Sequence, residues 1–264
     1  MLEKKLNDYL TLRPLSLCLA ISAWLTSFPL LAAPAGYSVY WSDEFNGTAG
    51  TAPNSANWTY DTGATGWGNG ELENYTSSTT NAQIVADVNA TDGKSLAIIT
   101  LDPGGNNDTV GSYTSARIRS QGLQSFQYGY IEARVRMPFG QGIWPAFWML
   151  GNNISTVPWP GCGEMDIMEN IGKASEQALN HGSMHGPGYS GGSALTGIYT
   201  LPTGQFNAGY HTFGILWQAN QVQFYVDGNL YETHTPADIG TNSWVFNNVI
   251  HFIKVLKRSI DHEM

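Results

Sequence analysis

Short runs of alternating apolar and polar residues recur along this chain, separated by turns rich in Gly, Asn, Asp and Pro. Such runs are typical of β-strands with one buried face. The clearest are residues 95–101, 128–137, 212–217 and 222–226, and no window between 36 and 249 shows a convincing long helical stripe. The sequence therefore predicts an all-β fold, a β-sandwich (jelly roll) of two antiparallel sheets. One sheet is expected to curve into a concave groove for a linear polymer.

The N-terminal segment has the pattern of a secretory signal. No charged residue appears between Arg13 and Asp43, an apolar core spans 15–31, and small residues fill 33–35. A transmembrane helix is the alternative, but prolines interrupt the apolar run and no charged residue follows it closely. We therefore predict a signal peptide over residues 1–35 and secretion to the extracellular space or the periplasm.

The rest of the chain is large enough for one all-β domain, which we place at residues 36–249. Removal of the signal would leave Cys162 as the lone cysteine, so no disulfide can form within the exported chain. The formal net charge is -9, which disfavours nucleic acid and membrane surfaces as partners. Aromatic residues make up 12% of the chain, and their rings can stack on sugars. We expect a monomer whose partner is a neutral polysaccharide.

Three acidic residues crowd into one hexapeptide, Glu164-Met165-Asp166-Ile167-Met168-Glu169, although only 12% of residues are charged. On a strand, Glu164 and Asp166 share a face because side chains alternate with a period of two. Glu169 has the wrong parity to join them unless a bulge at Ile167 or Met168 inserts one extra residue. The alternative is an acidic edge strand that faces solvent.

Paired carboxyl groups of this kind fit one reaction well. Two carboxyls about 5 to 5.5 Å apart, one ionised and one protonated, are the equipment of a glycoside hydrolase that retains anomeric configuration. The hexapeptide therefore predicts a catalytic site on this strand.

The chain resembles family 16 glycoside hydrolases, and among them the bacterial laminarinase-like endo-β-1,3-glucanases. The family signature is a glutamate, an aspartate and a second glutamate across a bulged strand, and residues 163–169 match it. The likeness covers residues 37–247, and further matching blocks lie at 41–47, 67–75, 113–118, 144–150 and 224–228.

The resemblance implies a role for each carboxylate. Glu164 would be the nucleophile, Glu169 the general acid and base, and Asp166 the residue that adjusts the charge between them. It implies an endo-acting hydrolase that cuts β-1,3 glucosidic bonds, and possible action on mixed β-1,3-1,4-glucan is left open.

Six residues are candidates for substrate contact. Trp144 and Trp148 lie four residues apart on an expected strand, so they share a face and suit two stacking positions. One of them could instead be core. The others, named by resemblance, are Arg117, Asn46, Glu71 and His185. Structural roles stay open for these four, because a loop Asn often caps a turn and a strand Arg often pairs with a carboxylate.

The sequence predicts no catalytic metal and no required cofactor. His181 and His185 have the spacing of a zinc pair on a helix, but nearby glycines and Pro187 deny them a helix, and no third ligand is evident. The resemblance implies a structural calcium ion with ligands from near both ends of the domain. Whether this chain binds calcium is left open.

Residues 250–264 depart from the family pattern. Lys254, Lys257 and Arg258 concentrate basic charge there, and the family's last strands have no counterpart, as in a truncated or frameshifted reading frame. We therefore expect a divergent tail and a sandwich that lacks its last strands. Two alternatives to an active hydrolase follow, a non-catalytic β-glucan-binding domain and an inactive fragment.

Overall fold

The computed structural model describes residues 36–105 and 108–258, with side chains described as far as Phe252. The predicted signal peptide lies outside this range. All described residues belong to one compact unit, residues 32–264. Within the described ranges, no helix has the length and apolar character needed to cross a membrane.

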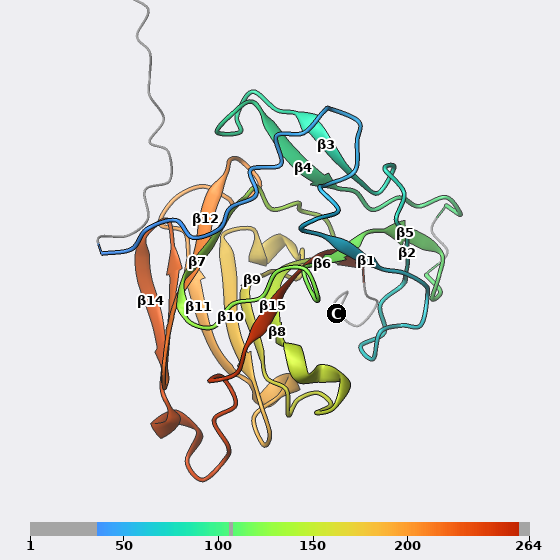
Figure 1. Ribbon diagram of the computed structural model, residues 1–264. Helices are drawn as coiled ribbons and strands as arrows, with labels where there is room; N and C mark the ends of the chain where they lie inside the picture. Colours follow the sequence, from blue (N-terminus) through green and yellow to red (C-terminus); the bar gives the residue numbers. More distant parts are fainter. Residues whose placement is uncertain (1–35, 106–107, 259–264) are drawn as a thin grey trace, which may run out of the picture. The chain divides into compact units, whose positions relative to one another are not determined.

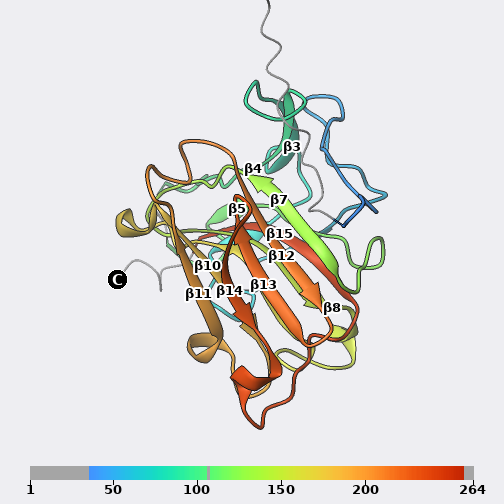
Figure 2. The ribbon, with the colours of Figure 1, turned by 90° about the vertical axis from the view of Figure 1, so that its left-hand side faces the viewer.

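Two antiparallel sheets form the sandwich (Figure 1). The larger has seven strands in the order β1 (Thr59–Asp61), β6 (Arg117–Arg119), β15 (Ile250–Arg258), β8 (Ile143–Gly151), β9 (Glu164–Glu169), β10 (Leu179–His185) and β11 (Leu195–Thr200). The smaller, which faces the viewer in Figure 2, has the order β14 (Asn229–His234), β13 (Gln221–Val226), β12 (His211–Gln218) and β7 (Gly129–Val135). The predicted all-β sandwich is confirmed.

The remaining elements are short. Strands β2 (Glu73–Tyr75) and β5 (Tyr113–Ser115) pair in parallel, and β3 (Ala82–Ala86) and β4 (Lys94–Ile98) pair in antiparallel fashion. Among the described residues, four 3-10 helices lie in loops: η1 (Asn152–Ser155), η2 (Ala174–Glu176), η3 (Gly191–Ser193) and η4 (Pro236–Ile239).

The main core lies between the two large sheets. Strands β8 and β9 direct Phe147, Met149, Met165 and Met168 into it, and they meet aromatic and aliphatic residues of β12 and β13. Trp217 is fully buried there, and its indole N–H donates to the Phe246 carbonyl (2.7 Å). Alternation then directs the other residues of β8 and β9 to the opposite face, where the acidic side chains lie.

The C-terminal segment is a strand of the large sheet, so the predicted boundary at residue 249 is wrong. Strand β15 pairs with β8 over nine residues and with β6 on its other side. Ile250 and Phe252 are buried in the main core, and Phe252 packs against Phe126 with ring centroids 4.8 Å apart. The sequence reasoning weighed the basic composition of this segment and missed its strand period. Residues 259–264 lie outside the described range.

Candidate active site

A β-bulge brings the three acidic side chains of β9 to one face of the large sheet. Glu164 lies opposite Leu150 of β8, Asp166 opposite Trp148, and Glu169 opposite Ala146. Met168 pairs with Phe147, so Ile167 is the extra residue, and the register with β10 shifts at the same place. The predicted bulge is confirmed. We call this side of the sheet the carboxylate face.

Strand β9 lies inside the sheet, between β8 and β10. Residues Met165 to Met168 are buried, and Glu164 and Glu169 are partly buried. The alternative of a solvent-facing acidic edge strand is therefore wrong. Asp166 is 3% exposed, and burial of a carboxylate is costly unless partners stabilise it.

Asn180 satisfies the backbone groups that the bulge displaces from the ladder. Its Oδ1 accepts from the Glu169 backbone N–H (3.2 Å), and its Nδ2 donates to the Ile167 carbonyl (3.3 Å). The same amide nitrogen donates to the Tyr231 hydroxyl of β14 (3.2 Å). Two residues along β10, Gly182 leaves room for this hydroxyl, because a Cβ there would clash with it. Sequence reasoning missed Asn180, although an Asn two residues before a glycine in a strand is a usable signal.

His185 of β10 supports Asp166. Its Nε2 lies 3.0 Å from Asp166 Oδ2 and 3.9 Å from Glu164 Oε1, while the Gly191 backbone N–H donates to its Nδ1 (3.1 Å). Burial lowers the pKa of His185, but the bond to Asp166 and the charges of Asp166, Glu164 and Glu169 outweigh it and raise the pKa to about 9. Protonation of Nδ1 removes its acceptor lone pair, so it must break the Gly191 bond. In either state Nε2–H can donate to Asp166.

The two predicted tryptophans share the carboxylate face, as expected. The Trp144 indole N–H donates to Glu169 Oε1 at 2.6 Å. Trp148 is 6% exposed and packs in a second cluster with Tyr75, Leu150 and Cys162. Trp148 thus has the core role that the sequence left open, while sugar stacking by either indole stays a prediction.

Arg117 and Glu71 belong to a cluster of ion pairs toward the β1 end of the sheet. Arg117 Nε lies 3.0 Å from Asp61 Oδ2 and its Nη1 lies 3.8 Å from Glu71 Oε1, while Arg119 Nε lies 3.1 Å from Asp61 Oδ1. Glu71 is fully buried and accepts from the Tyr75 hydroxyl (2.6 Å). These contacts provide the structural role left open for Arg117 and Glu71. Substrate contact by either stays a prediction.

The Arg117 guanidinium also lies between two indoles. Its Cζ is 4.8 Å from the ring centroid of Trp67 and 4.9 Å from that of Trp148. Cation–π contact and ion pairing therefore fix the same side chain, which links this cluster to the tryptophan on β8.

The last candidate, Asn46, has no described contact with the acidic residues of β9. It is exposed, and its backbone carbonyl accepts from Lys94 Nζ (3.1 Å). No hydrogen bond among the described residues joins it to the acidic side chains of β9, so its substrate contact also stays a prediction.

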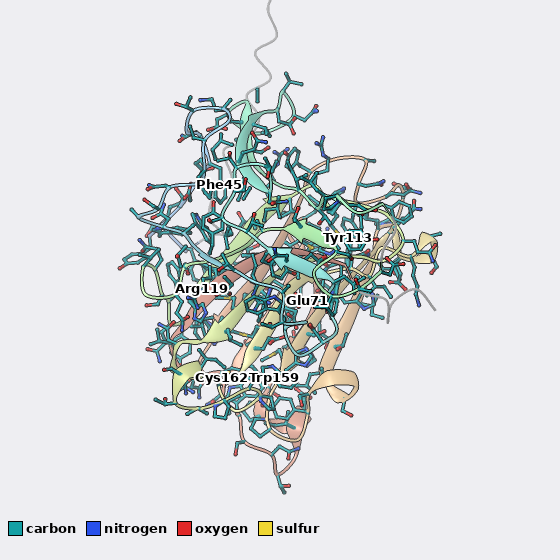
Figure 3. All side chains as sticks on the ribbon, turned by 90° about the vertical axis from the view of Figure 1, so that its right-hand side faces the viewer. Phe45, Glu71, Tyr113, Arg119, Trp159 and Cys162 are labelled. Carbon is teal, nitrogen blue, oxygen red and sulfur yellow. The ribbon has the colours of Figure 1, made fainter. Side chains whose placement is uncertain are left out.

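Sequence reasoning also missed Trp159. Its side chain is 46% exposed, and its ring centroid lies 6.1 Å from that of His185. Figure 3 labels Trp159 and Cys162, and further along the sheet Glu71 and Arg119. The signal available in the sequence was a tryptophan five residues before the acidic hexapeptide.

A cation could be held at one place on this face. Ligand atoms of Glu164, Asp166 and His185 all lie within 4.8 Å of one another, and no other group of three such donors occurs among the described residues. The 3.0 Å ion-pair contact between His185 Nε2 and Asp166 Oδ2 already accounts for the approach of these two side chains.

Fold and site together define a class of protein. A two-sheet sandwich whose central bulged strand directs two glutamates and an aspartate to one face carries the paired carboxyl groups that glycoside hydrolases use. The model of glycosyl hydrolases family 16 matches residues 71–254, and the chain belongs to this family. The match extends into β15, in agreement with the place of that strand in the sheet.

Relatives support the assignment. The chain is 34% identical to a beta-glucanase of Rhodothermus marinus over 228 residues, which cover 82% of this chain and 74% of that protein. An endo-beta-1,3-glucanase of Pyrococcus furiosus has 39% identity and a TM-score of 0.71, with 83% and 82% covered. The catalytic domain of a Thermotoga petrophila laminarinase has 36% identity and a TM-score of 0.73, with 84% and 87% covered.

Proposed function

We propose that this protein is a secreted, retaining, endo-acting β-glucan hydrolase that cuts β-1,3 glucosidic bonds and accepts mixed β-1,3-1,4-glucan as a second substrate. The observation that carries the proposal is the bulge in β9, which directs Glu164, Asp166 and Glu169 to one face. Relatives named as endo-1,3-glucanases support the choice of linkage.

The reaction would proceed by double displacement. Ionised Glu164 attacks the anomeric carbon while protonated Glu169 gives its proton to the departing glycosidic oxygen. Glu169, now ionised, then takes a proton from the water that releases the sugar from Glu164. Asp166, held by His185, places a negative charge on the same face and favours the proton on a neighbouring carboxyl.

Several further properties belong to the same proposal. The N-terminal pattern supports export to the extracellular space or periplasm, and the acidic surface supports a soluble monomer that binds neutral glucan. The two-carboxylate reaction needs no cofactor.

Release of reducing ends from four polysaccharides tests the substrate. We expect release from laminarin, less from barley mixed-linkage glucan, and none from agarose or carrageenan. The matched control is Glu164→Gln, which keeps the side-chain volume and removes the nucleophilic charge.

The result also separates the hydrolase from its main rival, a binding domain. Retention on insoluble β-1,3-glucan without release from either soluble glucan would favour binding alone. Release from agarose or carrageenan only would reject the glucan substrate while keeping the hydrolase.

A further inference from the structure

We propose that Trp144 is a positioning residue for Glu169, whose indole N–H determines which carboxyl oxygen carries the catalytic proton. The proposal rests on the proposed role of Glu169 as general acid and base. It goes beyond stacking on a sugar ring, because it uses the edge of the indole and leaves the ring faces available.

The contact is short and direct. Trp144 Nε1 lies 2.6 Å from Glu169 Oε1, slightly shorter than the usual distance of about 2.7–2.9 Å for an N–H donor to a carboxylate. Both residues are partly buried, so water competes less for the bond than at a free surface.

Glu169 is also held through its backbone. Its N–H donates to Asn180, which lies on the strand to the other side of β9 from Trp144. The side chain and the main chain of Glu169 therefore have separate anchors on β8 and β10. Few orientations of the carboxyl group satisfy both.

The bond distinguishes the two oxygens of Glu169. In a protonated carboxyl group the carbonyl oxygen is the better acceptor, and the hydroxyl oxygen is the donor. Because Oε1 accepts from the indole, the proton belongs on Oε2, which donates to the departing glycosidic oxygen. After that transfer Oε1 keeps the indole bond and Oε2 is ready to take a proton from water. One orientation of Glu169 thus serves both steps.

Other charged groups face Glu169 and set the background for its titration. On β9 they are Glu164 and Asp166, and on β10 they are His181, its register partner, and His185. His181 Nε2 lies 2.8 Å from Glu176 Oε2. None of these groups changes in a variant confined to Trp144.

Trp144→Phe removes the N–H and keeps an aromatic ring. A donor to the ionised form of Glu169 lowers the pKa of that carboxyl, so its loss should raise the pKa. The basic limb of the kcat/KM pH profile, where Glu169 must be protonated, should then move to higher pH. Trp148→Phe is the matched control, since it makes the same exchange four residues along the same face.

Kinetics on two substrates test the catalytic consequence. We expect Trp144→Phe to lower kcat/KM on laminarin about 10- to 100-fold, a part of what general acid–base catalysis contributes. With an aryl laminaribioside whose leaving group needs no proton, the rate of the glycosylation step should fall much less in Trp144→Phe. Trp148→Phe should lower kcat/KM by a similar factor on both substrates and should leave the basic limb of the pH profile in place. Equal losses for Trp144→Phe on both substrates, with an unmoved basic limb, would overturn the proposal.

Carbon-13 NMR titration of the Glu169 side-chain carboxyl tests the bond without any turnover. The apparent pKa should be higher in Trp144→Phe than in the wild type and unchanged in Trp148→Phe, with the coupled carboxyls followed in the same spectra. An apparent pKa of Glu169 that is the same in Trp144→Phe and in the wild type would reject the positioning role of Trp144, even in an active enzyme. If the wild type hydrolyses no glucan but the pKa of Glu169 is raised in Trp144→Phe, the proposed function would be rejected. The bond from Trp144 to Glu169 would still be supported.

Discussion

Two acidic clusters share one face of the large sheet, and their partners differ in kind. Around Asp61 and Glu71 the described charged partners are the guanidinium groups of Arg117 and Arg119. Around Asp166 and Glu169 the described partners are an imidazole and an indole N–H.

The difference separates a structural cluster from a site that can exchange protons. A guanidinium stays charged at any ordinary pH and favours ionised carboxylates beside it. An indole N–H can bond either form of a carboxyl, and an imidazole can itself titrate. The indole bond at Glu169 therefore suits a residue that must gain and lose a proton in every turnover.

The largest expected effect comes from the nucleophile. Glu164→Gln should lower turnover of laminarin by at least about 10³-fold while the thermal melt stays close to the wild type, because volume and shape are kept. Asp61→Asn makes the corresponding change in the other cluster and should retain turnover within about 10-fold. Loss of turnover to the same extent in both variants would erase the distinction between the clusters.

The next effect concerns the bulge. Asn180→Ala removes the partner of the Glu169 N–H and the Ile167 carbonyl, and a displaced catalytic group can cost about 10²-fold in rate. Unsatisfied backbone groups should also lower stability by about 1–3 kcal/mol. Ser183→Ala, on the same strand beside Asp166, is the control and should change both quantities little. Turnover of laminarin and urea denaturation of both variants measure these two effects. A wild-type turnover rate in Asn180→Ala would show that the bulge holds Glu169 in place without Asn180.

The arginine cluster should act mainly on stability. Arg117→Met leaves Glu71 buried without its guanidinium partner. Removal of one partner from a buried ion pair lowers the free energy of unfolding by about 3–5 kcal/mol. Arg134→Met is the control, because Arg134 also lies over an aromatic ring, Tyr210 at 4.5 Å, but on the smaller sheet. Denaturant unfolding of the two variants should differ clearly. Equal, small losses would mean that the Arg117 cluster contributes little to the fold.

The smallest effect is pH-dependent. The pKa of His185 is raised from 6.5 to about 9, so the stability that its protonation contributes is fully present below about pH 6.5 and is lost as the pH rises through 9. The difference in unfolding free energy between wild type and His185→Asn should therefore shrink over that interval, by on the order of 1–3 kcal/mol. A difference that grows with pH would contradict the sign of the shift.

Parity was enough to predict the arrangement of the carboxylates. Glu164 and Asp166 follow the strand period, Glu169 breaks it, and the break located the bulge before the register was known. The family resemblance then supplied the roles. The partners of these residues were beyond such reasoning, because the bond from Trp144 and the bond to Asn180 depend on which strands are neighbours.

The C-terminal strand shows the opposite limit. Composition and departure from the family pattern suggested a tail, but Ile250 and Phe252 have the period of a strand and fill the core between the sheets. The place for them exists only once β6 and β8 are assembled on either side. The alternation of residues 250–252 was too short to predict a strand by itself, because β15 is held by its two neighbouring strands.

The most direct test of the central claim is the anomeric configuration of the first product. Proton NMR of laminarin incubated with the full chain, recorded before mutarotation is complete, should show new reducing ends that appear first as the β-anomer. The signal should be absent with Glu164→Gln. New ends that appear first as the α-anomer, or a folded protein that releases none, would contradict a double displacement by Glu164 and Glu169.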